Sequence, residues 1–319
     1  MRREDRARLI ADVEREWAAA GLRGSFLARD LRTGREIGLR AHEAWPLASV
    51  VKLPLAAVVL DAFTRGEARP DEQVVLDVAD RTAGPTGIAL LRHPCRVALE
   101  DLVRLALALS DNAAADALFE RWGPAEVTAR LRSLGVEDAV VRHPMRSLYG
   151  TSRLVHSVGL DIAVRGGGPD GDHVIDELAV DRANVGTASG LVGLLDAAWA
   201  DRLGSPGVGP RLREMLGHQT TRHRLASELV SDTVRVRSKT GTFLSLRHEV
   251  GVVEAVDADD DAGRAPVAIA MLTRCAVPAI ENIEADLAIG QTARMIVEAL
   301  QDAGDRHDRH DQHDSGGRR

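Results

Sequence analysis

The sequence predicts an α/β protein with an antiparallel sheet flanked by helices and an additional all-helical lobe. Three observations predict it: an N-terminal helical pattern leads into a hairpin, a long and mainly helical stretch follows, and three strand patterns and a helix close the chain. A sheet whose two halves are separated by a helical insert produces this order of elements. We therefore expect the N- and C-terminal parts to meet in one sheet.

The elements follow from local periodicity. Apolar residues at helical spacing predict an amphipathic helix over residues 5–20, and two strand-like runs joined around Thr33 and Gly34 predict a hairpin over 24–41. Helical patterns then occupy about 50–65 and two closely joined segments within 99–123, which end at a Gly-Pro pair. These helices form the expected insert.

The second half of the chain contains the remaining elements. The least regular stretch, 143–184, includes a glycine-rich loop, and after it the patterns predict a helix at 187–204, strands at 232–242, 246–256 and 266–274, and a helix at about 281–301. We expect one two-lobed domain over residues 1–303. Its α/β lobe would comprise about 1–48 and 205–303, its all-α lobe about 49–204, and a disordered His/Asp-rich tail 304–319.

Composition excludes several classes of protein. A net charge of −7 and 3% aromatic residues argue against a nucleic-acid partner, because phosphate binding needs a dense basic face. The apolar runs are shorter than the roughly 20 residues that span a bilayer, and the N-terminus lacks the features of a signal peptide. We therefore expect a cytoplasmic monomer that does not bind membranes. Cys95 and Cys275 lack metal-ligand spacing and are expected to be free thiols.

The two lysines point to the chemistry. Of 41 lysines and arginines only Lys52 and Lys239 are lysine. With Ser49 one helical turn before it, Lys52 can reach the serine hydroxyl. A desolvated lysine can remove the serine proton, whereas an arginine guanidinium stays charged at any accessible pH. The S-x-x-K pattern therefore predicts a serine nucleophile with a lysine base, although the pattern alone is a weak signal that more often marks a helix cap and a surface charge.

Two further triplets strengthen that prediction. Ser110 begins an S-D-N triplet at a helix junction, 61 residues after Ser49, and Lys239 begins a K-T-G triplet on a predicted strand, 129 residues further on. Gly241 would let a substrate backbone approach this strand and pair with its edge. The order S-x-x-K, S-D-N, K-T-G is far more specific than any one of these motifs.

With these motifs the sequence resembles the class A serine β-lactamase and penicillin-binding protein superfamily over roughly residues 5–303. The segments "GPTGIALLRHPCRVALEDLVRLALALSDNAAADAL" and "RHEVGVVE" extend the resemblance beyond the triplets. The resemblance implies a β-lactamase/transpeptidase-like fold and a serine acyl hydrolase that works through an acyl-enzyme, most simply a β-lactamase acting on a small β-lactam, amide or ester. It implies no cofactor and no metal.

The resemblance also implies a role for each residue. Ser49 would be the acylated nucleophile, Lys52 its proton acceptor and Ser110 a proton relay to the departing nitrogen, with Lys239 supplying positive charge near the substrate carboxylate. Four more residues would bind substrate: Asn112 its amide side chain, Thr240 its carboxylate, Thr242 the oxyanion through its backbone N–H together with that of Ser49, and Gly241 its backbone. Arg247 is a candidate second carboxylate anchor, and a plain surface arginine is the equal alternative.

One motif of the family is missing. Class A enzymes hydrolyse the acyl-enzyme with the glutamate of an E-x-x-L-N loop, and the nearest match here, "IDELA" at 175–179, has Ile175 in its place. Glu177 is the candidate replacement, and Asp176, Asp170 and Asp172 are others. Without a deacylating base the acyl-enzyme would persist. Three alternatives therefore stay open beside the β-lactamase: a D,D-peptidase-like activity, an esterase, and a slowly deacylating penicillin-binding or sensor protein.

Overall fold

Five antiparallel strands in the order β2-β1-β9-β8-β7 form the main sheet of the computed structural model, which describes residues 1–150, 175–256, 265–276 and 282–315. The strands come from both ends of the chain, as predicted: β1 (Leu22–Asp30), β2 (Glu36–Leu39), β7 (Val234–Phe243), β8 (Leu246–Ala255) and β9 (Val267–Cys275). β1 pairs with β9 along its whole length, which joins the N-terminal hairpin to the C-terminal strands. Among the described residues β7 is an edge strand of the sheet, and it packs against the 3-10 helix that begins the helical lobe.

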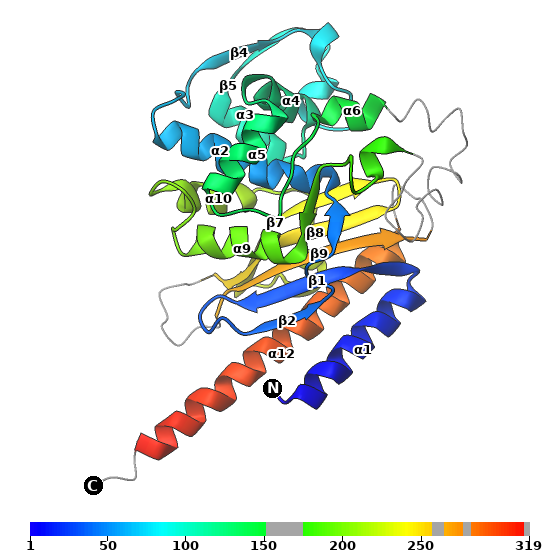
Figure 1. The fold of residues 1–319 in the computed structure, drawn as a ribbon, viewed down its shortest axis with the longest axis vertical. Coiled ribbons are helices and arrows are strands. Elements are labelled where there is room, and N and C mark those ends of the chain that lie inside the picture. Colours follow the sequence, from blue (N-terminus) through cyan, green and yellow to red (C-terminus); the bar gives the residue numbers. More distant parts are fainter. Residues whose placement is uncertain (151–174, 257–264, 277–281, 316–319) are drawn as a thin grey trace.

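Helices cover both faces of the sheet because side chains alternate along each strand. Phe26 and Ala28 of β1 join the apolar cluster of α1 (Arg3–Ala19) and α12 (Ile283–Ser315), whereas Leu27 between them joins the cluster of α9 (Ala188–Trp199). Figure 1 shows α1 and α12 side by side below the sheet. Trp17 of α1 links the two helices, since its indole Nε1 donates a hydrogen bond to Thr292 Oγ1 of α12 at 3.0 Å.

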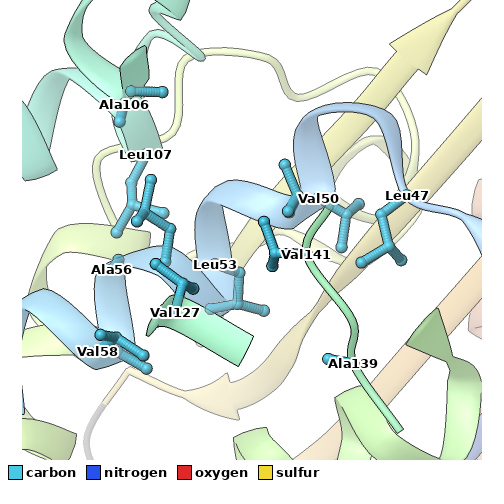
Figure 2. Close-up of a cluster of buried hydrophobic side chains, with 14 of the residues drawn as sticks. Leu47, Val50, Leu53, Ala56, Val58, Ala106, Leu107, Val127, Ala139 and Val141 are labelled. Carbon is cyan, nitrogen blue, oxygen red and sulfur yellow. The ribbon is translucent and has the colours of Figure 1, made fainter. Parts of the chain in front are cut away.

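The helical lobe is built around α2 (Lys52–Thr64), which the short 3-10 helix η1 (Ala48–Val51) precedes. Every residue of α2 from Lys52 to Phe63 is buried, and a helix that is apolar all round belongs in the centre of a core. Figure 2 shows Leu53 and Ala56 of α2 among side chains of the surrounding helices, including Leu107 and Val127. The other helices of this lobe are α3 (Leu99–Ala108), α4 (Asn112–Arg121), α5 (Pro124–Ser133), α6 (Met145–Gly150) and α10 (Val208–Leu216).

Smaller elements complete the described part of the chain. They are β3 (Ala44–Pro46) paired with β6 (Val185–Thr187), β4 (Gln73–Leu76) paired with β5 (Cys95–Ala98), α11 (Leu225–Leu229), and the 3-10 turns η2 (Val78–Asp80), η3 (Gly87–Leu90) and η4 (Asp176–Leu178).

The structure confirms the predicted fold class, an antiparallel sheet flanked by helices with an all-helical lobe, and differs in two details. Residues 49–204, the predicted helical lobe, include α9, which packs on β1 and β9 because its apolar side chains meet the sheet. The tail 304–319 was expected to be disordered, yet the backbone of α12 remains helical to Ser315. No proline or glycine interrupts this helix between Gly304 and Gly316, and elongating an existing helix costs far less than starting one.

Candidate active site

Ser49 and Lys52 lie at the junction of η1 and α2. Lys52 Nζ is 3.1 Å from Ser49 Oγ. Both residues are buried, Lys52 completely and Ser49 to all but 6% of its surface. Ala48 before them has φ +46°, a left-handed conformation that non-glycine residues rarely adopt. Such strain is typical of backbone that is held in place for a functional side chain.

The S-D-N turn brings two strong acceptors to Lys52. Nζ lies 2.7 Å from the carbonyl oxygen of Ser110 and 2.7 Å from Asn112 Oδ1, and it lies 3.3 Å from Ser110 Oγ. A carbonyl or amide oxygen can only accept. A neutral Lys52 amine would therefore use its two protons on these oxygens and direct its lone pair at the serine hydroxyls, with Ser49 the nearer. This is the arrangement that a base for Ser49 requires.

Local chemistry explains the shape of this turn. Ser110 has φ +56°, which turns its carbonyl toward Lys52. Asp111 caps α4, because Oδ1 accepts from the N–H groups of Ala113 (2.9 Å) and Ala114 (3.1 Å), and Oδ2 accepts from Ile88 N at 2.6 Å. A Cβ on Gly87 would lie 2.1 Å from Asp111 Oδ2, so only glycine fits there. The capping carboxylate thus holds the turn on two sides.

Burial changes the protonation of both lysines. Desolvation lowers the pKa of Lys52 to about 7, against the opposing charges of Asp111 and Asp116. Desolvation and then the charge of Lys52 lower the pKa of Lys239 well below its usual value. A large fraction of Lys52 is therefore neutral near pH 7, which is the form that can accept a proton.

Gly241 determines how closely the K-T-G strand approaches the nucleophile. A Cβ there would lie 2.8 Å from the carbonyl oxygen of Leu47 and 2.9 Å from Val50 Cγ2, both beside Ser49. The structure gives Gly241 a structural reason, because β7 packs directly against η1 at this residue. That Gly241 also lets a substrate backbone approach the strand stays a prediction.

Sequence reasoning missed Arg224, one of 39 arginines and part of no motif. It is 1% exposed, and its guanidinium donates to Thr242 Oγ1 (2.8 Å), to the carbonyl of His248 (2.8 Å) and to Asp286 (2.6 Å). A buried, permanently charged group against the last residue of K-T-G-T is thus balanced by one carboxylate. The feature that identifies Arg224 is the burial of its guanidinium, which the tertiary structure reveals and the sequence does not.

Arg247 is not a surface residue, so that alternative is wrong. It is fully buried, and its Nη1 donates to the carbonyls of Leu244 and Leu246 at 3.3 and 3.1 Å. Its Nε and Nη2 have no partner within the described ranges. It pairs with Thr242 across β7 and β8, so both side chains project from the same face of the sheet. Its role in holding a carboxylate stays a prediction.

The deacylation candidates lie in a different environment. Ile175, the first residue of the nearest match to the missing motif, is 1% exposed and belongs to the core of the helical lobe. Glu177 lies half-buried in η4, and Asp176 is exposed, 3.4 Å from Arg182. Asp170 and Asp172 lie outside the described residues. No group of acidic, His or Cys side chains in the described ranges could hold a metal ion.

The two cysteines are free, Cys275 buried and Cys95 partly buried. None of the helices described is long and apolar enough to cross a membrane.

Known proteins match this chain over nearly its whole length. Residues 6–300 match the family model described as the β-lactamase enzyme family. A β-lactamase regulatory protein, BlaB, from Streptomyces cacaoi is 41% identical over 315 residues, which cover 92% of this chain and 98% of the relative. The structure of an ancestral class A β-lactamase superposes with a TM-score of 0.73 at 25% identity, covering 91% of this chain and 99% of the other. A penicillin-binding protein, PBP-A, in an acyl-enzyme complex with penicillin G superposes with a TM-score of 0.73 at 17% identity, covering 93% and 97%.

Proposed function

The chain belongs to the β-lactamase enzyme family, whose chemistry is that of serine hydrolases, and we propose that β-lactams acylate Ser49 with Lys52 as the proton acceptor. The hydrogen-bond partners of Lys52 are the main support for this proposal. Two acceptors at 2.7 Å occupy the protons of the neutral amine, and Ser49 Oγ lies 3.1 Å from Nζ. A pKa of about 7 keeps that amine partly neutral near pH 7.

Acylation then proceeds by proton transfer and attack. Lys52 Nζ takes the proton of Ser49, and Ser49 Oγ forms a bond to the carbonyl carbon of the lactam while the C–N bond breaks. Ser110 Oγ, 3.3 Å from Nζ, passes its proton to the departing nitrogen and receives from Lys52 the proton that came from Ser49, which leaves both groups as they began. Thr240 N–H points away from β8, toward the free edge of β7. Because amide directions alternate along an antiparallel strand, the N–H of Thr242 points toward the same free edge. This direction supports a role for the Thr242 N–H in binding the oxyanion.

We propose further that the acyl-enzyme is long-lived. Hydrolysis needs a base for water, and the residue at the corresponding motif position is the buried, apolar Ile175. A relative that is 41% identical and named as a β-lactamase regulatory protein also supports a long-lived acyl-enzyme. A protein that reacts with a β-lactam and keeps it would report the presence of the drug rather than remove it.

β-Lactam hydrolysis is the second candidate. Glu177 lies two residues after Ile175, on the half-buried η4 turn, and would be the base that activates water for attack on the acyl group. The two candidates share the acylation step and differ only in the lifetime of the adduct.

The test follows adduct and product together. Mix the protein with a chromogenic cephalosporin, and record intact mass and colour over minutes to hours for wild type, Ser49→Ala and Glu177→Gln. The expected result is a single adduct on wild type that persists for hours with about one equivalent of colour, and none on Ser49→Ala.

Each other outcome has a definite meaning. Continuous colour without a lasting adduct, lost in Glu177→Gln, would establish the hydrolase. An adduct that also forms on Ser49→Ala would overturn the assignment of the nucleophile. The absence of any adduct or colour would contradict β-lactam acylation and favour an amide or ester of different shape.

A further inference from the structure

The residue before the nucleophile has a left-handed backbone. Ala48 has φ +46°, whereas Leu47 is in the ordinary right-handed helical region. Alanine gains nothing locally from a positive φ, so contacts around the turn must hold it there. Figure 2 shows the side chains of Leu47 and Val50, on either side of the turn, in the apolar cluster. The buried carbonyls of this segment also need hydrogen-bond partners.

His248 holds the carbonyl oxygen of Pro46, two residues before Ala48. Its Nε2 lies 2.8 Å from that oxygen, and the N–H of Thr273 donates to its Nδ1 at 2.9 Å. A nitrogen of a neutral imidazole that accepts a hydrogen bond carries no proton, so the proton lies on Nε2, which donates to Pro46. The imidazole therefore links β9 to the backbone that leads into the turn.

Both the charge and the orientation of this ring are fixed. His248 is fully buried, and burial lowers its pKa to about 3, against the opposing effect of the hydrogen bond to Pro46. The indole of Trp45 meets the imidazole edge to face, with ring centroids 6.3 Å apart and an interplanar angle of 80°. The donor to Pro46 thus stays in place over the pH range in which Lys52 changes its charge.

The sheet is rearranged around His248. β8 and β9 pair in register on both sides of residues 247–248, but not at these two residues of the described strands. Side chains satisfy the backbone there instead: the N–H of Thr273 donates to His248 Nδ1, and Arg224 donates to the carbonyl of His248 at 2.8 Å. Bulged strands likewise break the ladder where a side chain is redirected next to a site.

The pairing of β7 with β8 places the ring on the side of the nucleophile. His248 lies opposite Gly241, so the imidazole and the Cα hydrogen of Gly241 belong to the same face of the sheet. A Cβ on Gly241 would lie 2.8 Å from the carbonyl oxygen of Leu47, and His248 reaches the carbonyl oxygen of Pro46. Two opposite residues of the sheet thus approach two consecutive carbonyls that precede Ser49.

We propose that His248 is a positioning residue for acylation: through the carbonyl of Pro46 it holds the left-handed turn at Ala48, and so fixes where Ser49 lies beside β7. It does not touch the reacting atoms, and Lys52 makes its hydrogen bonds to other groups. Loss of the Nε2–H donor therefore slows the attack of Ser49 without moving the pH at which Lys52 loses its proton. This inference rests on the proposed function, because it concerns the acylation step.

Two substitutions separate the two hydrogen bonds of the ring. His248→Gln can place an amide N–H at the position of Nε2–H but gives up the acceptor for Thr273, whereas His248→Asn can keep that acceptor but gives up the donor to Pro46. Both variants lose the aromatic ring, so each is the matched control for the other. Intact mass follows labelling of Ser49 by a chromogenic cephalosporin and, separately, by an alkyl fluorophosphonate. Calorimetry in the Ser49→Ala background gives the dissociation constant of the cephalosporin.

We expect His248→Asn to slow labelling by both reagents at least about twentyfold and His248→Gln by no more than about threefold, since a small displacement of a nucleophile costs a large factor in rate. The dissociation constant should stay within about twofold, and the rise of the rate should remain centred near pH 7. Adding Ala48→Gly to His248→Asn should recover at least about fivefold of the rate, because glycine adopts a positive φ without strain.

Spectra of 15N-histidine in wild type test the hydrogen bond itself, whether or not the variants fold. The ring of His248, assigned through its contact with the amide of Thr273, should keep its proton on Nε2 and should not titrate between pH 8 and about pH 5.

Several results would overturn the inference. They are equal slowing in the glutamine and asparagine variants, a loss confined to the dissociation constant, and a proton on Nδ1 of His248. Labelling of wild type by the fluorophosphonate alone, with the two variants still separated, would overturn the proposed function and uphold the role of His248. Absence of labelling by both reagents would overturn both.

Discussion

Replacing Lys52 by methionine tests the central claim about the site, namely that burial suppresses the charge of this lysine. Methionine fills similar space without an ionisable group. An arginine would be unsuitable, since it would force a permanent charge into a fully buried position.

The expected size of the effect follows from two pKa values. In the unfolded chain Lys52 holds its proton up to about pH 10.5, whereas in the folded protein it releases it above about pH 7. Between these values the unfolded state binds more protons, so wild-type stability rises with pH. At pH 7 the suppressed charge costs the fold about 4 kcal/mol, and at pH 9.5 about 1 kcal/mol.

The free energy of unfolding of Lys52→Met, relative to that of wild type, should therefore be about 3 kcal/mol higher at pH 7 than at pH 9.5. The variant also loses hydrogen bonds to Ser110 and Asn112, but that cost is the same at both pH values. Removing the Lys52 charge also raises the pKa of Lys239, which adds an effect in the same direction.

Denaturant unfolding of both proteins at the two pH values measures this difference. Ser49→Ala is the control, because it alters the same site without removing a titrating lysine, and its effect should not depend on pH. The chain has only two lysines, so 13C-lysine labelling gives two Cε resonances whose titration reports the pKa values directly. An equal effect of Lys52→Met at both pH values, with both lysines titrating near 10, would refute the reasoning.

Three further predictions concern the same site. The rate of Ser49 acylation should rise with pH around an apparent pKa of about 7. Asp111→Asn should move this rise to lower pH, because the Asp111 charge stabilises protonated Lys52. Stopped-flow labelling from pH 5 to 9 measures the rate for both proteins. Gly241→Ala should destabilise the fold by about 1–3 kcal/mol and slow acylation at least tenfold, since the new Cβ would meet the Leu47 carbonyl at 2.8 Å, as thermal unfolding and labelling will report. Ile175→Glu should speed adduct loss at least tenfold relative to Ile175→Gln, because only the carboxylate can activate water, as timed mass spectra will reveal.

Each of these has an opposing result. A rise that Asp111→Asn moves to higher pH, or leaves in place, would mean that this carboxylate does not act on Lys52. Normal stability and labelling in Gly241→Ala would mean that β7 does not need its close approach to η1. Equal adduct lifetimes in the glutamate and glutamine variants would mean that the position of Ile175 cannot serve deacylation.

The sequence by itself determined the fold class, because apolar periodicity distinguishes strands from helices and the order of elements brings both chain ends into one sheet. It also singled out Ser49, Lys52, Ser110 and Lys239, since motif spacing is a property of the chain alone. The structure brings Lys52 Nζ within hydrogen-bonding distance of both Ser49 Oγ and Ser110 Oγ.

Only the tertiary structure decided the environment of those residues. Desolvation, which lowers the pKa of both lysines, depends on atoms from elements far apart in sequence, as does the burial of Arg224 and Arg247. The contact of Gln219 with Thr240 joins residues from a loop and a strand and carries no motif. A sequence pattern records which groups are present, but their charge and the direction of their protons depend on neighbours that only folding assembles.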